Sequence, residues 1–492
     1  MDGLEAYNKC LEKLIWACDR LQVGVERTQL SQIADLIVQP MTGLWRFFHT
    51  PQHIFEVGGS EDAIETLAAL FHDLVYVQVD RSVSLNLSYY ITPLIKEVNG
   101  QLAIREPVDW PNDFTSEIVV SIFGFVPGQV LKPFAGQNEF LSALVAAKVL
   151  EPLLLPSHLM QIIACIEATI PFRPKSKSGL TASEQLYERL RVTNRRFNLR
   201  LSEEEIQEAV KKAVRLANRD IGGFADPCSA NFLTNTWNLL PETNHNLINV
   251  GSYTVRDYRI AVQKMEEFMN FLTPENIFYQ FQGEPEEQFY QAWVNGARKN
   301  LEIARLYLGS KMVAIALMEA LSYGIGFDIS LATLMGELPY QGSKGFRLEK
   351  FIPDVTNAHE PKTALELEVL NLLEKGRSEN SDSDLKESPL ATFIVKSIGF
   401  EEMQHQCRQA KEFFKGNIPA VDFISGFNRT VTAIVVEALV QLFDSRKSSI
   451  RRYYYGIISG SKPKPPTNSQ ELLDRATDPP ALDTIKPSCP QN

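Results

Sequence analysis

The sequence predicts a mainly α-helical protein with two helical domains. Apolar residues recur at helical spacing through most of the 492 residues, and strong β-strand signals are scarce. With 44% hydrophobic residues, a chain of this length can bury more than one core. We expect a first domain over residues 1–310, a helical C-terminal domain over residues 311–458, and a disordered tail rich in Pro and Ser over residues 459–492.

Charge and cysteine content narrow the possible partners and the compartment. The 49 basic and 60 acidic residues give a net charge of −11, which argues against nucleic acid or an anionic membrane as the main partner. The six cysteines lie far apart and include no CxxC pair, which is typical of reduced thiols in the cytosol. The N-terminus lacks a signal-peptide pattern, and charged residues and prolines interrupt the most apolar run, 141–172. We therefore expect a cytoplasmic protein without a membrane span, and we make no prediction of its oligomeric state.

The first two helical elements are predicted from periodicity and from an N-cap pattern. Residues 3–38 carry apolar side chains at helical period and are predicted to form one N-terminal helix. Thr50 and Pro51 then suit the N-cap and the first helical position, because proline lacks an N–H group that would be unpaired there. This predicts that His53 lies in the first turn of the new helix and that His49 lies just before it.

The next helix is predicted to begin near Ser60 and to carry a histidine on its inner face. Two acidic residues, Glu61 and Asp62, are favourably placed at its positive end. The apolar stripe consists of Ile64, Leu67, Ala68 and Phe71. The stripe continues into His72, so we expect this imidazole to point into the protein.

The following region mixes helices and turns. Residues 86–95 have an amphipathic helical pattern, and the Asn99-Gly100 turn either ends a helix or connects a short strand pair. Helix character returns over residues 138–168, where Pro152 and Pro156 interrupt it. The basic loop 171–179 is more often simply solvated than a contact for a phosphorylated substrate.

A later helix places a carboxylate on an apolar face. Ser202 and Glu205 form a capping-box pattern at its start. Its apolar positions are Ile206, Val210, Ala213 and Ala217, and the next position of that series is Asp220. A carboxylate on such a face is costly without a cation or hydrogen bonds. A metal shared with the earlier histidines would supply the cation, and pairing with Arg219 or another arginine is the alternative.

The rest of the chain continues as helices with one polar interruption. We expect helices over residues 255–272, 285–308, 312–321, 364–373 and 419–443. Between them, residues 376–389 (GRSENSDSDLKESP) are predicted to be a polar, disordered linker. The basic and aromatic run 446–455 is read as a helix C-terminus whose cations face the helix dipole, in preference to a nucleic-acid strip.

The histidines of the first domain form a candidate metal site. His49 and His53 are four residues apart, and His72 is followed directly by Asp73. Imidazoles and carboxylates are the ligands that hold divalent metals in proteins. Taken singly, His49 is better explained as a core residue. A metal site is the better explanation for the set of His53, His72, Asp73 and Asp220.

The same residues resemble the HD superfamily of metal-dependent phosphohydrolases. The closer resemblance is to an uncharacterised branch in which an aromatic-His-x-x-x-His pair is followed by Phe-His-Asp and Val-Tyr. In this sequence these are Phe48-His49 with His53, then Phe71-His72-Asp73 with Val75-Tyr76. With weaker matches as far as 297–301, the resemblance covers roughly residues 10–305. It implies that the first domain is an HD-type helical bundle.

The resemblance also implies roles for the site residues. Class I cyclic nucleotide phosphodiesterases are more distantly similar, with the same His-x-x-x-His pair ahead of an HD dyad. By this resemblance His53, His72, Asp73 and Asp220 are metal ligands, and His49 protonates the leaving oxygen. The metal would be a divalent ion such as Mn, Mg, Ni, Co, Fe or Zn, and a metal-bound hydroxide would be the nucleophile.

The expected function is hydrolysis of a phosphoester in a nucleotide or another small phosphorylated metabolite. Two departures from the related sequences keep a second reading open. Residues 81–86 carry no acidic group after Asp80, and Thr169 is followed by Ile-Pro-Phe where related proteins often have a histidine. The alternative is therefore a non-catalytic HD-fold protein that binds a nucleotide or a partner protein. Monoesterase or diesterase activity, and one or two metals, stay open.

Overall fold

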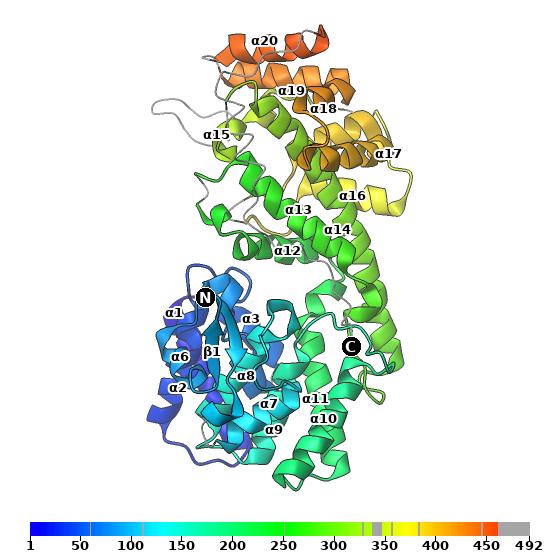
Figure 1. Cartoon of the computed structure of the whole chain (residues 1–492). Helices are drawn as coiled ribbons and strands as arrows, with labels where there is room; N and C mark the ends of the chain where they lie inside the picture. Colours follow the sequence, from blue (N-terminus) through cyan, green and yellow to red (C-terminus); the bar gives the residue numbers. More distant parts are fainter. Residues whose placement is uncertain are drawn as a thin grey trace. The chain divides into compact units, whose positions relative to one another are not determined.

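The protein is mainly α-helical, as the sequence predicts. The computed structural model describes residues 1–460 except 60, 111–112, 250, 327–328, 337–346, 356–357, 382–383 and 444–445. These residues form twenty α-helices and one two-stranded sheet (Figure 1). The expected disordered tail, apart from Ser459 and Gly460, lies outside the described residues.

The chain divides into two compact units. The first unit comprises residues 1–250, 260–308 and 363–388, and the second comprises 251–259, 309–362 and the described part of 389–492. One 36-residue helix, α14 (Glu287–Ser322), contributes to both units. We expected two helices here, but Gly309 and Ser310 do not interrupt the helix.

The N-terminal region contains two helices where one was predicted. Helix α1 (Gly3–Arg20) is capped by the side chain of Asp2, and α2 (Arg27–Met41) follows after a short connection. Gln22 adopts a left-handed conformation with φ of 56°, which ends the first helix. The prediction of a single helix was wrong because the apolar period continues on both sides of this break.

Helix α4 (Ala63–Phe71) is the centre of the first unit, since all nine of its residues are buried. It follows α3 (Pro51–Gly58), which begins after Thr50 as the Thr-Pro pattern predicts. The side chain of Asp62 caps α4 by accepting a hydrogen bond of 3.0 Å from the amide of Glu65. His72 follows the last turn and is 1% exposed, so its predicted inward orientation is confirmed.

The region after α4 contains short helices and the strand pair. These are α5 (Val77–Asp80), α6 (Leu85–Ile91), β1 (Ile95–Val98) and β2 (Gln101–Ile104). The strands are antiparallel, with Ile95 opposite Ile104. Asn99 and Gly100 connect them with φ values of 52° and 76°, which is the backbone of a tight hairpin turn.

Helices α7 to α11 complete the bundle that surrounds α4. They are α7 (Phe114–Phe123), α8 (Gln137–Leu150), α9 (Pro156–Ala168), α10 (Ala182–Phe197) and α11 (Glu203–Asp220). The predicted capping box at Ser202 and Glu205 is present at the start of α11. Helix α11 packs along α9 and also contacts α3 and α4, so its last residue, Asp220, reaches the region of the histidines.

The first unit is completed by three later helices and by the predicted linker. The helices are α12 (Ser229–Thr243), α13 (Val255–Phe271, shared with the second unit) and α16 (Ala364–Lys375). The described residues of 376–389 are only partly solvated, because residues 378–380 are exposed whereas Arg377 is only 2% exposed. Composition marks this segment as polar, but it does not reveal that Arg377 has a buried partner on α12.

The second unit contains α15 (Leu331–Met335), α17 (Pro389–Phe414), α18 (Ala420–Gly426), α19 (Arg429–Leu442) and α20 (Lys447–Ile458). The helix predicted over 419–443 is two helices, because Asn428 caps α19 through the amide of Val431. Arg446 precedes α20, so the basic run begins a helix and the predicted C-terminal position was wrong.

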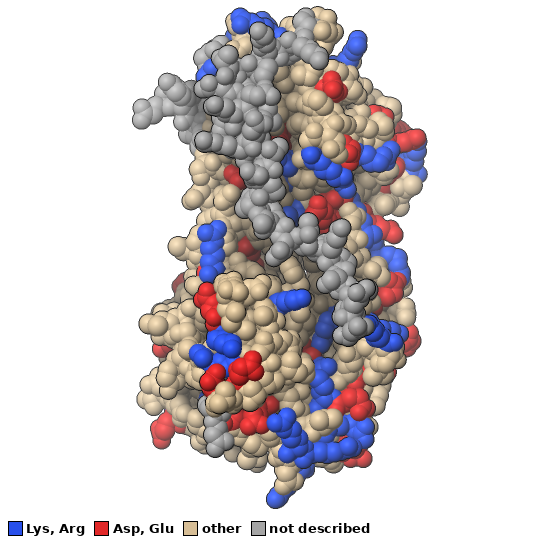
Figure 2. Space-filling view, in the orientation of Figure 1, with Lys and Arg blue, Asp and Glu red and all other residues tan. Residues whose placement is uncertain are grey.

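The 3-10 helices are Pro107–Asp109, Pro133–Ala135, Gly222–Ala225, His245–Ile248, Pro274–Asn276 and Leu348–Phe351. Among the described residues, no helix combines the length and apolar character of a membrane span. On the face of the molecule drawn in Figure 2, the acidic and basic side chains are interspersed.

Candidate metal centre

Three helices of the first unit bring four potential ligands together. His53 lies in the first turn of α3, His72 and Asp73 follow α4, and Asp220 is the last residue of α11. Each residue offers one nitrogen or oxygen atom, and these atoms all lie within 4.8 Å of one another. The group consists of the four residues that the sequence analysis proposed as ligands.

The spacing of the four atoms suits a shared ion. The His72 Nε2 atom lies 2.9 Å from Asp73 Oδ2 and 3.3 Å from Asp220 Oδ1. The His53 Nε2 atom lies 3.0 Å from Asp220 Oδ1 and 3.4 Å from Asp73 Oδ2. Metal–ligand bonds of about 2.0–2.2 Å separate neighbouring ligand atoms by about 3.0–3.5 Å. These atoms therefore have the mutual distances of ligands around one metal.

A hydrogen bond orients the His72 ring for this role. Its Nδ1 atom lies 2.8 Å from the carbonyl oxygen of Ala69, which can only accept a hydrogen bond. The Nδ1 atom must therefore carry the proton, and in the neutral imidazole the lone pair is on Nε2. This lone pair points into the group of four.

Asp73 provides a separate indication that the cluster is suited to a cation. Its Oδ2 atom is buried and lies 2.9 Å from Nε2 of His72 and 3.4 Å from Nε2 of His53. A buried carboxylate is costly unless a cation neutralises it. The two imidazoles and two carboxylates offer four ligand atoms within 4.8 Å of one another, a donor set that suits a divalent metal.

Without a metal, the two histidines of the cluster favour their protonated forms. Burial opposes the charge on His53, but the hydrogen bonds and charges of Asp220 and Asp73 outweigh this effect and raise the pKa of His53 to about 9. The pKa of His72 is also raised, against the effect of burial, chiefly by the charges of Asp73 and Asp220. Burial favours the neutral carboxyls, but the charge of His72 lowers the pKa of both Asp73 and Asp220. A bound metal would replace these protons.

The arginine alternative for Asp220 is not what the structure contains. The Arg219 guanidinium donates to Glu65, with Nη2 2.7 Å from Oε2, and to the carbonyl oxygen of Val57. The ion pairs of Asp220 are made with His53 and His72. Arg219 therefore connects α11 to α3 and α4, and the neighbouring Asp220 pairs with the histidines of the cluster.

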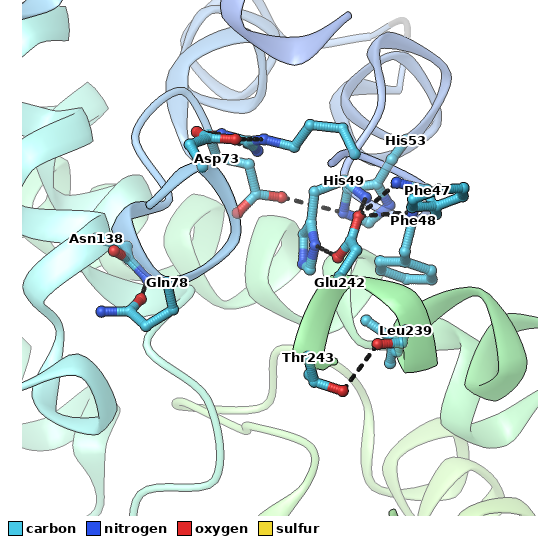
Figure 3. A network of polar contacts seen from close by, with 12 residues as sticks. Phe47, Phe48, His49, His53, Asp73, Gln78, Asn138, Leu239, Glu242 and Thr243 are labelled. Atoms are coloured by element: carbon cyan, nitrogen blue, oxygen red, sulfur yellow. Dashed lines mark hydrogen bonds and ion pairs between the residues drawn. The ribbon is translucent and has the colours of Figure 1, made fainter. Parts of the chain in front are cut away.

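His49 lies beside the four-residue group and has a partner that the sequence analysis missed. Its Nδ1 atom lies 2.5 Å from Oε2 of Glu242, near the end of α12 (Figure 3). The Oε1 atom of Glu242 accepts hydrogen bonds from the amides of Phe47, Phe48 and His49 at 2.7, 2.7 and 3.0 Å. Helical period gave no signal for this residue, because Glu242 lies two positions after Leu240 and does not continue the apolar series of Leu233, Trp237 and Leu240.

Aromatic rings flank the two histidines of the His-x-x-x-His pair. The ring of Phe48 lies 5.0 Å from the ring of His49 and 4.9 Å from that of His53, between centroids. The ring of Tyr76 lies 4.6 Å from the ring of His49. His49 is only 14% exposed at its side chain, so its imidazole has few alternative orientations.

A buried arginine fixes the backbone that carries the HD dyad. Arg46 forms a two-pronged ion pair with Asp80, at 2.9 Å and 2.6 Å, and its Nη1 donates to the carbonyl oxygen of Asp73. Its side chain is fully buried. Asp80, the acidic residue nearest to the dyad in the following sequence, therefore has a structural partner and is not directed at the metal ligands.

Glu139 is a further acidic group that the sequence analysis did not select. Its Oε2 atom is buried without a hydrogen-bond partner. Burial raises the pKa of Glu139 to about 8, and the charges of Asp73 and Asp220 add to this. The neighbouring Asn138 accepts a hydrogen bond of 3.1 Å from the amide of Val77, which ties the start of α8 to the segment after the dyad.

The basic loop 171–179 supplies no free arginine to the site. Arg173 forms an ion pair with Glu167, with Nη1 2.6 Å from Oε1. Glu167 also pairs with Arg189 of α10. Arg173 therefore has a structural role in closing this loop against α9.

Comparisons with family models, with curated proteins and with solved structures found no match for this chain.

Proposed function

We propose that the protein is a metal-dependent phosphohydrolase of the HD type, acting on a phosphoester in a nucleotide or another small phosphorylated metabolite. The observation that carries this proposal is the convergence of His53, His72, Asp73 and Asp220 beside a histidine that is not part of the group. This division into four ligands and one separate imidazole is the one that the resemblance implies. It gives the site a place for a cation and a place for a proton donor.

The donor set fits a first-row divalent metal. Two imidazoles and two carboxylates suit Mn, Fe, Co, Ni or Zn, whereas Mg more often has only oxygen ligands. When bound, such a metal lowers the pKa of a water ligand and polarises a phosphoryl oxygen. The buried Oδ2 of Asp73 among the ligand atoms and the oriented Nε2 of His72 are the features that support metal binding.

His49 is the residue best placed to move a proton. Its Nδ1 faces Glu242, and its Nε2 makes no hydrogen bond to the described residues. A carboxylate on Nδ1 stabilises the imidazolium and fixes the ring, so that Nε2 can give a proton to a leaving oxygen. Glu242 touches no substrate in this scheme and acts as a positioning residue.

A non-catalytic HD-type protein is the second candidate, and one observation favours it. The raised pKa values of His53 and His72 mean that protonated imidazoles can neutralise Asp73 and Asp220 without any metal. In such a protein the cluster would stabilise the fold, and the site would bind a nucleotide or a partner protein without turnover.

A phosphoester panel distinguishes the two candidates. The purified protein would be assayed with mononucleotides, cyclic nucleotides, linear diesters and aryl phosphates in the presence of Mn, Mg, Ni or Co. Metal-dependent turnover that is lost in His72→Ala, but kept in His158→Ala, supports the enzyme. His158 lies outside the cluster on α9 and is a matched control. Binding of a nucleotide without turnover on any class, with or without bound metal, would favour the non-catalytic protein, and absence of metal under all conditions would contradict the enzyme.

A further inference from the structure

The segment after α16 is fastened to α12 by a buried arginine. We call the described residues of 377–388 the strap. The Arg377 guanidinium centre lies 4.3 Å from the centroid of the Trp237 ring, and Trp237 is fully buried. The Nη2 atom of Arg377 donates to the carbonyl oxygen of Leu385 at 2.9 Å. A cation buried against an aromatic face gains from both its charge and its stacking, so this contact is specific to arginine.

Asp384 closes the contact between Arg377 and Trp237. The Nε1 atom of Trp237 donates to Oδ2 of Asp384 at 2.9 Å, and Nη1 of Arg377 lies 3.5 Å from the same oxygen. The hydroxyl of Tyr307, on the part of α14 in the first unit, lies 3.1 Å from the hydroxyl of Ser388. The strap is thus held at both of its ends, and its one buried charge has a counter-charge.

The strap binds one face of α12 along two turns. The amide of Ser378 donates to the hydroxyl of Thr234 at 3.1 Å, and the Ser378 hydroxyl donates to Asn231. Asn231, Thr234 and Trp237 are spaced by three residues, so they lie on the same face of the helix.

The C-terminal end of α12 contacts the candidate proton donor, His49. Glu242 lies five residues after Trp237, which turns it about 140° around the helix. At this C-terminal end of α12 it pairs with the imidazole of His49 and accepts hydrogen bonds from the amides of Phe47–His49 (Figure 3). Helix α12 connects the strap to the His49 loop.

The last turn of α12 depends on these outside contacts. Pro241 lies inside the helix and has no N–H group, so one backbone hydrogen bond of that turn is missing. In the same turn the hydroxyl of Thr243 donates to the carbonyl oxygen of Leu239, at 3.1 Å (Figure 3). With one backbone bond fewer, this helix end relies more on contacts with its neighbours.

We propose that Arg377 is a positioning residue for His49, acting through Trp237 and α12. The strap holds α12, and α12 presents Glu242 to the His49 loop. Loosening the strap releases the imidazole while the metal ligands on α3, α4 and α11 keep their places. The importance of His49 for turnover rests on the proposed function, whereas the mechanical link does not.

Amide hydrogen exchange tests the link without metal or substrate, so its outcome is independent of whether the protein is a phosphohydrolase. The variant is Arg377→Lys, which keeps the charge but loses the planar stacking and the forked donors. The matched control is Arg305→Lys, whose guanidinium donates to the carbonyl oxygens of Met269 and Leu272 away from α12. We expect the amides of Phe47–His49 to exchange at least about tenfold faster in Arg377→Lys, with those of α4 unchanged. Unchanged exchange at Phe47–His49, when the strap amides have become fast, would overturn the proposal.

If the variant does not fold, a measurement on the wild-type protein tests the link between the strap and Phe47–His49. Native-state exchange is followed at increasing sub-denaturing guanidinium concentrations, and the opening free energies of the strap and of Phe47–His49 are compared. The proposal expects both segments to open in one cooperative step with the same dependence on denaturant. Opening of Phe47–His49 at denaturant concentrations that leave the strap closed would overturn it.

Discussion

The Oε2 atom of Glu242 lies 2.5 Å from Nδ1 of His49, across 193 residues of sequence. The other oxygen of the same carboxylate accepts three consecutive amide hydrogen bonds from the loop that carries His49. One side chain therefore sets both the backbone and the imidazole of the candidate proton donor. Burial opposes its charge, but His49 and these amides lower the pKa of Glu242, so it is a carboxylate at neutral pH.

Replacing this carboxylate is expected to impair turnover without removing the metal. Glu242→Gln keeps the size of the side chain but cannot stabilise an imidazolium, and we expect a loss of about 10²–10⁴-fold in kcat. Metal content should equal that of the wild type. The control is Glu117→Gln, which removes a surface partner of Arg196. Full activity in Glu242→Gln would show that this carboxylate does not orient a proton donor.

His49→Ala is expected to retain metal and to lose activity in a substrate-dependent way. An alkyl phosphate releases a poor leaving group that needs a proton, whereas a nitrophenyl phosphate releases a stable phenolate. The loss should therefore be much smaller for the nitrophenyl ester, and kcat on the two substrates is the measurement. Equal losses on both esters would exclude His49 as the donor, and loss of metal would make it a ligand.

Metal binding is expected to release protons and to strengthen as the pH rises. The metal-free pKa of His53 is about 9 and that of His72 is raised as well, so both imidazoles are protonated at pH 7 and must lose a proton before they bind. Calorimetry in two buffers of different ionisation enthalpy should detect about one to two protons released per ion. Metal binding with no buffer dependence of the enthalpy would contradict the assignment of these histidines as ligands.

The same shifts predict a pH dependence of stability in the metal-free form that the metal-bound form lacks. A histidine whose pKa is raised in the folded state stabilises the fold below its unfolded pKa of 6.5, and this contribution is lost as the pH rises through about 9. Thermal melts of metal-free protein should thus show a falling Tm between pH 6.5 and 9. Excess metal should remove this decline, and a metal-free Tm that rises over this range would show that the cluster is not protonated.

Substitution of Arg46 tests how much its buried ion pair with Asp80 contributes to the stability of the fold around His72 and Asp73. Arg46→Met leaves Asp80 partly buried without its cation, and we expect a loss of about 3–5 kcal/mol in unfolding free energy. Guanidinium unfolding measures this directly. The double variant Arg46→Met/Asp80→Asn removes the stranded charge, so it should recover part of the loss. Equal stability of single and double variants would mean that the pair is not the source of the effect.

The sequence predicted the site wherever the chemistry was local or periodic. His53, His72 and Asp73 lie within short motifs, and Asp220 stood out as a carboxylate at the next position of an apolar helical face. Glu242 gave no such signal, because it does not continue the apolar series of α12 and its partner His49 lies 193 residues earlier in the chain. The position of Asp220 beside the two histidines follows from the packing of α11 on α9, which no local pattern specifies.

The wrong predictions of local structure share a physical cause. Each concerns a residue whose structure depends on a partner distant in the sequence or on its backbone conformation. Arg377 lies in a polar segment whose composition predicts disorder, yet Trp237 and Asp384 bury it. Gln22 breaks the first helical region by adopting a positive φ, for which a glutamine gives no signal. The mainly helical class could be predicted because helical period is visible in the sequence along nearly the whole chain.

Metal analysis of purified, gel-filtered protein tests the central claim most directly. Wild type, Asp220→Asn and the control Asp113→Asn would be loaded with Mn, Fe, Co, Ni or Zn and measured by elemental mass spectrometry. Asp113 is a half-buried aspartate paired with Lys148 away from the cluster. The account predicts stoichiometric metal in wild type and Asp113→Asn and its loss in Asp220→Asn. Wild-type protein that retains none of these metals, or Asp220→Asn protein that retains as much as wild type, would contradict it.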